Sequence, residues 1–164
     1  MRTLHILRHG KSTWDLPGIS DIDRPLLEKG IINNYFMAEV ILQKFPSPEL
    51  IITSPACRAL HTATIIARAL KLSTNIIELN KRIYESSAST VLDIIEETAS
   101  EINCLMIVGH NPTFTELANL FLPQAIDNVP TSGLVTLHFE VKKWSIIDKT
   151  PIFAELNYPK KNNE

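Results

Sequence analysis

Three short motifs, far apart in the chain, carry the residue types that bind and transfer a phosphoryl group. They are residues 7–10 (LRHG), 54–58 (SPACR) and 109–112 (GHNP). Arginine presents a planar set of N–H donors that fits phosphoryl oxygens, and a neutral imidazole is a nucleophile for phosphorus. The motifs therefore predict a phosphoryl-transfer site in which His9 attacks, Arg8 and Arg58 neutralise the oxygens, and His110 donates a further hydrogen bond.

Each motif directly follows an apolar run that predicts a buried strand, and helices with apolar residues at helical spacing separate these strands. We expect strands at 3–8, 49–53, 75–79 and 105–108, helices at 28–44, 56–70, 89–100 (with Ser89 as N-cap) and 112–121, and a late pair of strands at 134–141 and 144–147. This alternation predicts an α/β fold with three α/β/α layers and a mainly parallel central sheet. The carboxyl ends of parallel strands meet at one edge, so the three motifs should lie together.

Length and composition limit the classes of function. The 164 residues predict one domain over 1–158 and a polar tail over 159–164. The net charge of −2 gives no overall attraction to nucleic acid or to an anionic membrane. There is no apolar run of about 18 residues and no signal-peptide pattern, so we expect a cytoplasmic protein. The sequence has no cluster of histidine, cysteine and aspartate at metal-ligand spacing, so we expect neither a metal nor a cofactor.

The motifs resemble those of the histidine phosphatase superfamily, also called phosphoglycerate-mutase-like, and most closely its SixA-type phosphohistidine phosphatases. The segments that carry this resemblance are 8–15 (RHGKSTWD), 23–26 (DRPL), 54–59 (SPACRA), 62–63 (TA), 84–85 (YE), 108–112 (VGHNP), 127–133 (DNVPTSG) and 158–160 (YPK). They occur in order over nearly the whole chain. The resemblance implies the histidine phosphatase fold.

The resemblance also implies roles for individual residues. His9 would be the phosphorylated nucleophile, and Arg8, Arg58 and His110 would form the rest of the phosphate pocket. Arg24 matches an arginine near the phosphate, although it can equally be a loop residue paired with Asp21 or Asp23. Two further residues, Ser12 and Asn111, are candidates for binding phosphate or substrate.

Glu85 is the candidate general acid, because larger members of the superfamily use a carboxylate after the third strand to protonate the leaving oxygen. Its alternative role is that of a solvated loop residue. A phosphohistidine leaves as imidazole, and a protonated imidazole is a far better leaving group than an alkoxide, so the substrate can take its own proton from water. A SixA-type enzyme therefore does not need this carboxylate.

We weigh three functions. The leading one is a metal-independent phosphatase that removes phosphate from phosphohistidine on proteins, with a histidine phosphotransfer domain as partner. The connections between the predicted strands and helices are short, which leaves an open site. An open site suits a protein surface as substrate and so favours this function. The second is a phosphatase of small phosphoesters, which would need an acid. The third is a non-catalytic module that binds phosphate or a phosphoprotein.

Overall fold

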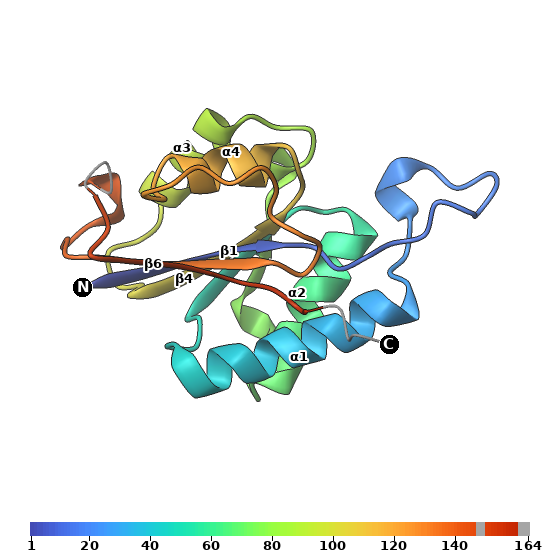
Figure 1. Ribbon diagram of the computed structural model, residues 1–164, viewed down its shortest axis with the longest axis horizontal. Coiled ribbons are helices and arrows are strands. Elements are labelled where there is room, and N and C mark those ends of the chain that lie inside the picture. Colours follow the sequence, from blue (N-terminus) through green and yellow to red (C-terminus); the bar gives the residue numbers. More distant parts are fainter. Residues whose placement is uncertain (147–149, 161–164) are drawn as a thin grey trace.

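The chain folds into three layers, with a six-stranded sheet between two pairs of helices (Figure 1). The computed structural model describes residues 1–146 and 150–160. The strands are β1 (Arg2–Arg8), β2 (Leu50–Thr53), β3 (Ile77–Leu79), β4 (Cys104–Gly109), β5 (Leu134–Phe139) and β6 (Phe153–Asn157). The α-helices are α1 (Glu28–Lys44), α2 (Cys57–Ala69), α3 (Ala88–Glu96) and α4 (Thr113–Asn119).

The sheet has the order β3-β2-β4-β1-β5-β6. The first four strands in this order pair in parallel, whereas β5 is antiparallel to both β1 and β6. The predicted α/β class and mainly parallel sheet are therefore confirmed. Since β1 and β4 are central, the segments that follow them lie in the middle of one sheet edge.

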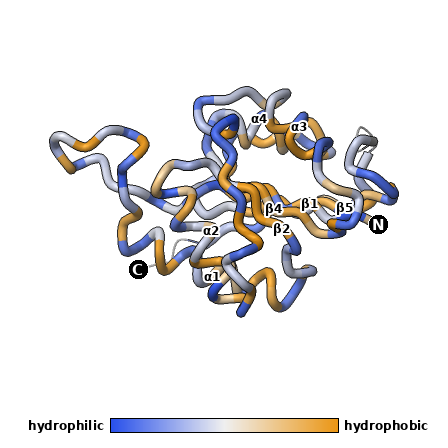
Figure 2. The backbone as a smooth tube through the Cα atoms, turned by 180° about the vertical axis from the view of Figure 1, so that it is seen from behind, coloured by the Kyte–Doolittle hydropathy of each residue, from blue (hydrophilic) through white to orange (hydrophobic). Residues whose placement is uncertain are grey.

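Two apolar clusters hold the layers together. Leu4 and Ile6 of β1 point to the face covered by α3 and α4, and Leu7 points to the face covered by α1 and α2. Figure 2 shows the central strands as a continuous apolar region. Burial on both faces explains why these strands are apolar runs rather than alternating patterns. Among the described residues, no helix combines the length and apolar composition needed to span a bilayer.

The late strands differ from the prediction. The partner of β5 is β6, and residues Trp144–Ile146 form a 3-10 turn instead of a strand. The indole of Trp144 is buried, and its Nε1 donates to the carbonyl of Ile102 at 2.8 Å, which anchors this segment beside α3. Ile147, the last residue of the predicted strand, lies outside the described residues.

Two other element boundaries also differ. Ser87, rather than Ser89, caps α3: its hydroxyl accepts from the backbone N–H of Thr90 at 3.2 Å. The third strand begins only at Ile77, because a 3-10 turn over Thr74–Ile76 precedes it. Neither shift moves a candidate site residue away from the sheet edge.

Residues 9–27 leave β1 as an arm that projects from the body of the molecule (Figure 1). A bridge between Ser12 and Leu26 closes the base of the arm, and a 3-10 turn over Asp21–Asp23 lies within it. The first turn of α1 packs directly on this base, since a Cβ at Gly30 would lie 2.3 Å from the Lys11 carbonyl oxygen. Only glycine allows this close approach.

Candidate active site

The strand register brings the three motifs together. Arg8 pairs with Gly109, and Thr53 pairs with Val108, so β1, β2 and β4 end at the same level. The backbone N–H of His9 donates to the carbonyl of Gly109 at 3.0 Å. The residues that come directly after these strands therefore lie side by side at one edge of the sheet, as the sequence predicts. They are His9, Ser54 and His110.

A cavity of about 580 Å³ opens at this edge. It is lined by the candidate residues Arg8, His9, Ser12, Arg24, Arg58, His110 and Asn111, together with Lys11, Trp14, Asp21, Asn128, Pro130 and Thr131. Three arginines and a lysine give it a strongly positive lining, although the chain as a whole is slightly negative. Such a lining suits an anion with several oxygens.

His9 is held in one tautomer. Its Nδ1 lies 2.8 Å from the carbonyl oxygen of Gly10, which can only accept, so Nδ1 carries the proton. Nε2 therefore carries the lone pair, and this lone pair accepts a long hydrogen bond from the Nε of Arg58 at 3.4 Å. Burial, followed by the charges of neighbouring groups, lowers the pKa of His9 from 6.5 to about 3. The imidazole is neutral at pH 7, as a nucleophile must be.

A buried polar network supports the His9 segment from behind. The hydroxyl of Thr62 accepts from the N–H of Gly10 at 3.0 Å and from the side-chain amide of Asn34 at 2.9 Å. The hydroxyl of Ser132 donates to Asn34 Oδ1 at 2.7 Å, and the N–H of Ser132 donates to the His9 carbonyl. The network ties α1 and α2 to the loop before β5, and so fixes the backbone that carries the nucleophile.

Arg58 lies in the first turn of α2 and is 5% exposed. Its terminal nitrogens donate to Asp21, from Nη1 to the backbone carbonyl at 2.7 Å and from Nη2 to the carboxylate at 3.1 Å. Because this end of the guanidinium is held by Asp21, its Nε faces His9.

The other two arginines approach from different segments. Arg8 donates from Nη1 to the Val129 carbonyl at 2.9 Å. Arg24 pairs with the Asp21 carboxylate at 3.0 Å, and its guanidinium stacks on the Trp14 ring at 3.5 Å from the centroid. Arg24 therefore both lines the cavity and pairs with Asp21, one of the two acidic partners that the sequence offered.

His110 faces His9, with 5.0 Å between the ring centroids. Its Nε2 lies 2.7 Å from the hydroxyl of Ser54, and its Nδ1 is buried without a hydrogen-bond partner among the described residues. The ring of Tyr84 packs edge-on against it at 5.6 Å. Burial, with a smaller effect of Arg58, lowers the pKa of His110 to about 4.

Asn111 and Glu85 have surroundings that bear on their candidate roles. The amide of Asn111 donates to Asn128 and to the Val129 carbonyl, and its oxygen accepts from the N–H and the hydroxyl of Thr115. Asn111 thus shapes the cavity wall and caps α4. Glu85 is exposed and has a positive φ of 53°. It lines an adjoining cavity of about 480 Å³ rather than the one that contains His9.

Several lining residues have no site role from sequence reasoning, and they include Trp14 and Asp21. Both lie in the arm, where neither periodicity nor a strand end marks a position. The spacing of Asp21 from Arg24 indicates that the two can pair, but no sequence signal indicates that Asp21 also pairs with Arg58 and lines the cavity.

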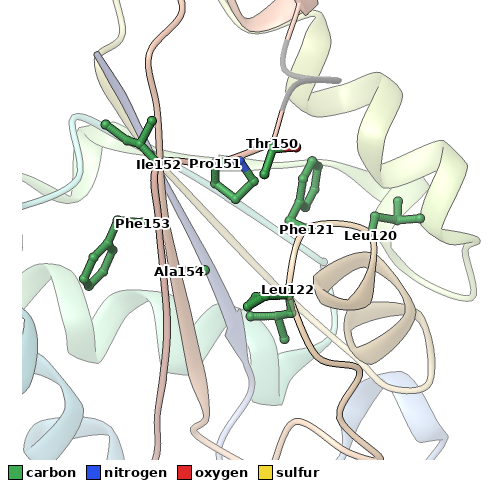
Figure 3. Close-up of a pocket in the computed structure, with 9 residues that line it drawn as sticks. Leu120, Phe121, Leu122, Thr150, Pro151, Ile152, Phe153 and Ala154 are labelled. Carbon is green, nitrogen blue, oxygen red and sulfur yellow. The ribbon is translucent and has the colours of Figure 1, made fainter.

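A third cavity, of about 400 Å³, lies between the end of α4 and β6 (Figure 3). It is lined by Leu120, Phe121, Leu122, Pro123, Thr150, Pro151, Ile152, Phe153 and Ala154. None of these side chains is charged or a strong nucleophile, so this cavity is not a candidate for phosphoryl transfer.

Comparison with known proteins agrees with this geometry. Residues 4–89 match the model of the histidine phosphatase superfamily, branch 1. The chain belongs to this superfamily. It is similar to a crystal structure from Agrobacterium tumefaciens assigned to the SixA phosphohistidine phosphatases (27% identity, TM-score 0.81, 97% of this chain and 99% of that one). It has the fold of the protein histidine phosphatase SixA solved with tungstate (21% identity, TM-score 0.78, 93% and 95%).

Two further proteins are also similar to this chain. An uncharacterized protein of Mycobacterium tuberculosis is 27% identical over 141 residues, which cover 80% of this chain and 85% of the relative. A mycobacterial glucosyl-3-phosphoglycerate phosphatase has the same fold, with 19% identity and a TM-score of 0.64 over 96% of this chain and 98% of that one. The solved structures that share this fold thus include phosphatases named for different substrates.

Proposed function

We propose that this protein is a metal-independent phosphatase that removes phosphate from phosphohistidine on proteins through a phosphorylated His9. The observation that carries the proposal is the neutral His9 imidazole, which lines a cavity together with three arginines and has its Nε2 lone pair beside Arg58. In this proposal residues 1–158 work as one domain, because the cavity draws its walls from residues 8 to 131.

The reaction has two steps. First, the Nε2 lone pair of His9 forms a bond to phosphorus while the bond between phosphorus and the substrate imidazole breaks. That imidazole leaves with a proton from solvent. Second, water attacks phosphorus while the bond between phosphorus and His9 Nε2 breaks and its electron pair returns to the imidazole. The attacking water loses a proton to solvent, which leaves inorganic phosphate and neutral His9. Arg8, Arg24 and Arg58 neutralise the transferring oxygens, which is the task a metal ion performs in other phosphatases.

The rim of the cavity supports a protein substrate. Trp14 is 79% exposed although it is large and apolar, and Leu16 and Ile19 of the same arm are also exposed. A basic cavity bordered by exposed apolar side chains fits a phosphoryl group on an apolar protein surface, such as that of a histidine phosphotransfer domain.

The test is phosphate release from a histidine-phosphorylated protein and from a panel of sugar phosphates, in the presence of EDTA. The wild type and Glu85→Gln are compared. We expect fast release from the phosphoprotein by both, since the leaving imidazole needs no acid from Glu85. Release mainly from sugar phosphates, abolished in Glu85→Gln, would instead establish a phosphoester hydrolase. Loss of activity in EDTA would contradict metal independence.

Replacing Trp14 with alanine should separate the two classes of substrate. We expect kcat/KM for the phosphoprotein to fall roughly tenfold, since a buried aromatic anchor contributes more than about 1 kcal/mol to an interface. For a small phosphoramidate, kcat/KM should change less than threefold. Leu42→Ala, which removes an exposed apolar side chain from α1, is the matched control and should change neither value. Equal losses on both substrates would show that Trp14 acts through Arg24 and not through the partner.

A further inference from the structure

Asp21 is the carboxylate at the centre of the cavity wall. Its Oδ2 accepts from the hydroxyl of Tyr84 at 2.5 Å and from Arg58 Nη2 at 3.1 Å, and its Oδ1 accepts from Arg24 Nε at 3.0 Å. The three donors come from the segment before α3, from α2 and from the arm. One side chain thus joins three separate parts of the site.

This arrangement fixes the direction of Arg58. Both of its terminal nitrogens are engaged by Asp21, so the guanidinium cannot turn its terminal pair toward an anion without breaking those bonds. Its Nε is left pointing at His9 Nε2. Asp21 also lies between the positive charges of Arg24 and Arg58 and reduces their mutual repulsion.

A carboxylate in an anion-binding cavity repels the ligand, so its presence needs a compensating benefit. The Asp21 side chain is 46% exposed, which means that burial does not force these contacts. The Tyr84 hydroxyl and the Arg58 guanidinium lower the pKa of Asp21 to about 2, and the hydroxyl stays protonated because the same contact raises the pKa of Tyr84 to about 12. The negative charge is therefore permanent at any working pH.

We infer that Asp21 is a positioning residue, which holds Arg58 with its Nε toward His9 at the expense of affinity for phosphate. This inference rests on the proposed phosphatase function. Asp21 does not contact the reacting atoms itself and acts on them by positioning Arg58. Tyr84 in turn holds Asp21 in place. The arrangement favours the transition state over the bound ground state, which is the condition for a high kcat.

The experiment compares Asp21→Asn with Asp23→Asn. Asp23 is an exposed residue of the same 3-10 turn, and its carboxylate accepts only from Ser20 among the described residues. Both variants remove one negative charge from the arm, but only the first loosens the arginines. For each protein we would measure the rate of His9 phosphorylation by a small phosphoramidate, kcat, and the Kd of inorganic phosphate by calorimetry.

For Asp21→Asn we expect phosphorylation of His9 and kcat to fall by roughly tenfold or more, since small misplacements of catalytic groups cost up to about 10²-fold. The Kd of phosphate should fall, because Arg58 is free to grip it. Tyr84→Phe should lower kcat by a smaller factor, and Asp23→Asn should match the wild type. An unchanged kcat in Asp21→Asn would overturn the inference. A loss of phosphate affinity in proportion to the loss of kcat would also overturn the inference, because it would mean that the substitution disrupts the whole pocket.

Failure of the proposed function would look different. In that case the wild type would not become phosphorylated on His9 at all. The phosphate measurement would still test Asp21, because calorimetry needs no turnover: binding by Asp21→Asn no tighter than by Asp23→Asn would overturn the inference.

Discussion

Replacing His9 with alanine is expected to abolish turnover and to leave inorganic phosphate bound. Loss of a nucleophile that acts together with its neighbours lowers kcat by roughly 10³-fold or more. The cavity keeps Arg8, Arg24 and Arg58, each held by at least one contact to a residue other than His9, although Arg58 loses the contact of its Nε with His9. The Kd of phosphate, measured by calorimetry, should therefore change less than about threefold.

Detection of the covalent intermediate is a second measurement on the same variant. With a radiolabelled phosphoryl donor, the wild type should carry an acid-labile label that His9→Ala lacks. His61→Ala is the matched control, because His61 is an exposed histidine of α2 that does not line the cavity. It should be labelled like the wild type. Full activity of His9→Ala would show that His9 is not the nucleophile. Loss of phosphate binding in this variant would show that the His9 side chain is needed to form the pocket.

The location of the site could be predicted from sequence because it depends on strand ends. An apolar run followed by a polar motif marks the end of a parallel strand, and parallel strands leave their carboxyl ends at one edge. The order of the strands was not needed for this. It was enough that Arg8, Thr53 and Gly109 end strands of the same sheet.

The contacts behind the site could not be predicted in this way. Asn34 is fully buried in α1, while Ile32 and Phe36 of the same helix are more than half exposed. Hydrophobicity alone therefore misjudges the buried face, because the amide of Asn34 is needed to bind Thr62 and Ser132. A buried polar side chain is stable only with partners, and those partners are distant in sequence.

The strand β6 was missed for a similar reason. Its sequence, FAELN, contains alanine, glutamate and asparagine, which are depleted in strands. Its position is set by pairing with β5, and by Lys44 of α1, which pairs with Glu155. Tertiary contacts thus supply what local preference does not, and a pattern-based prediction has no access to them.

Acid is expected to destabilise the fold strongly between pH 7 and pH 5. Three histidines are buried with lowered pKa values: His5 and His110 at about 4, and His9 at about 3. Burial is the largest cause in each case. An unfolded chain would titrate these groups near 6.5. Below that pH the unfolded state binds protons that the folded state excludes, so the free energy of unfolding falls as the pH falls.

The size of the effect follows from proton linkage. Between pH 7 and pH 5 each such histidine removes about 2 kcal/mol, and the three together remove roughly 6 kcal/mol. This is a large share of the stability of a typical domain. Asp21 acts in the same direction, but only as the pH falls from about 4 toward 2. The window between pH 7 and pH 5 therefore isolates the histidines.

Urea unfolding at several pH values measures this slope directly, and His5→Gln tests its origin. His5 bridges Thr136 and the Pro46 carbonyl far from the cavity, so the variant leaves the catalytic groups in place. Its absolute stability will fall because the packing changes. The slope between pH 7 and pH 5 should fall by up to about one third, since His5 no longer titrates while His9, His110 and His138, whose pKa is also lowered by burial, still do. A slope equal to that of the wild type would show that the pKa of His5 does not change on folding, and would contradict the lowered pKa that burial gives it.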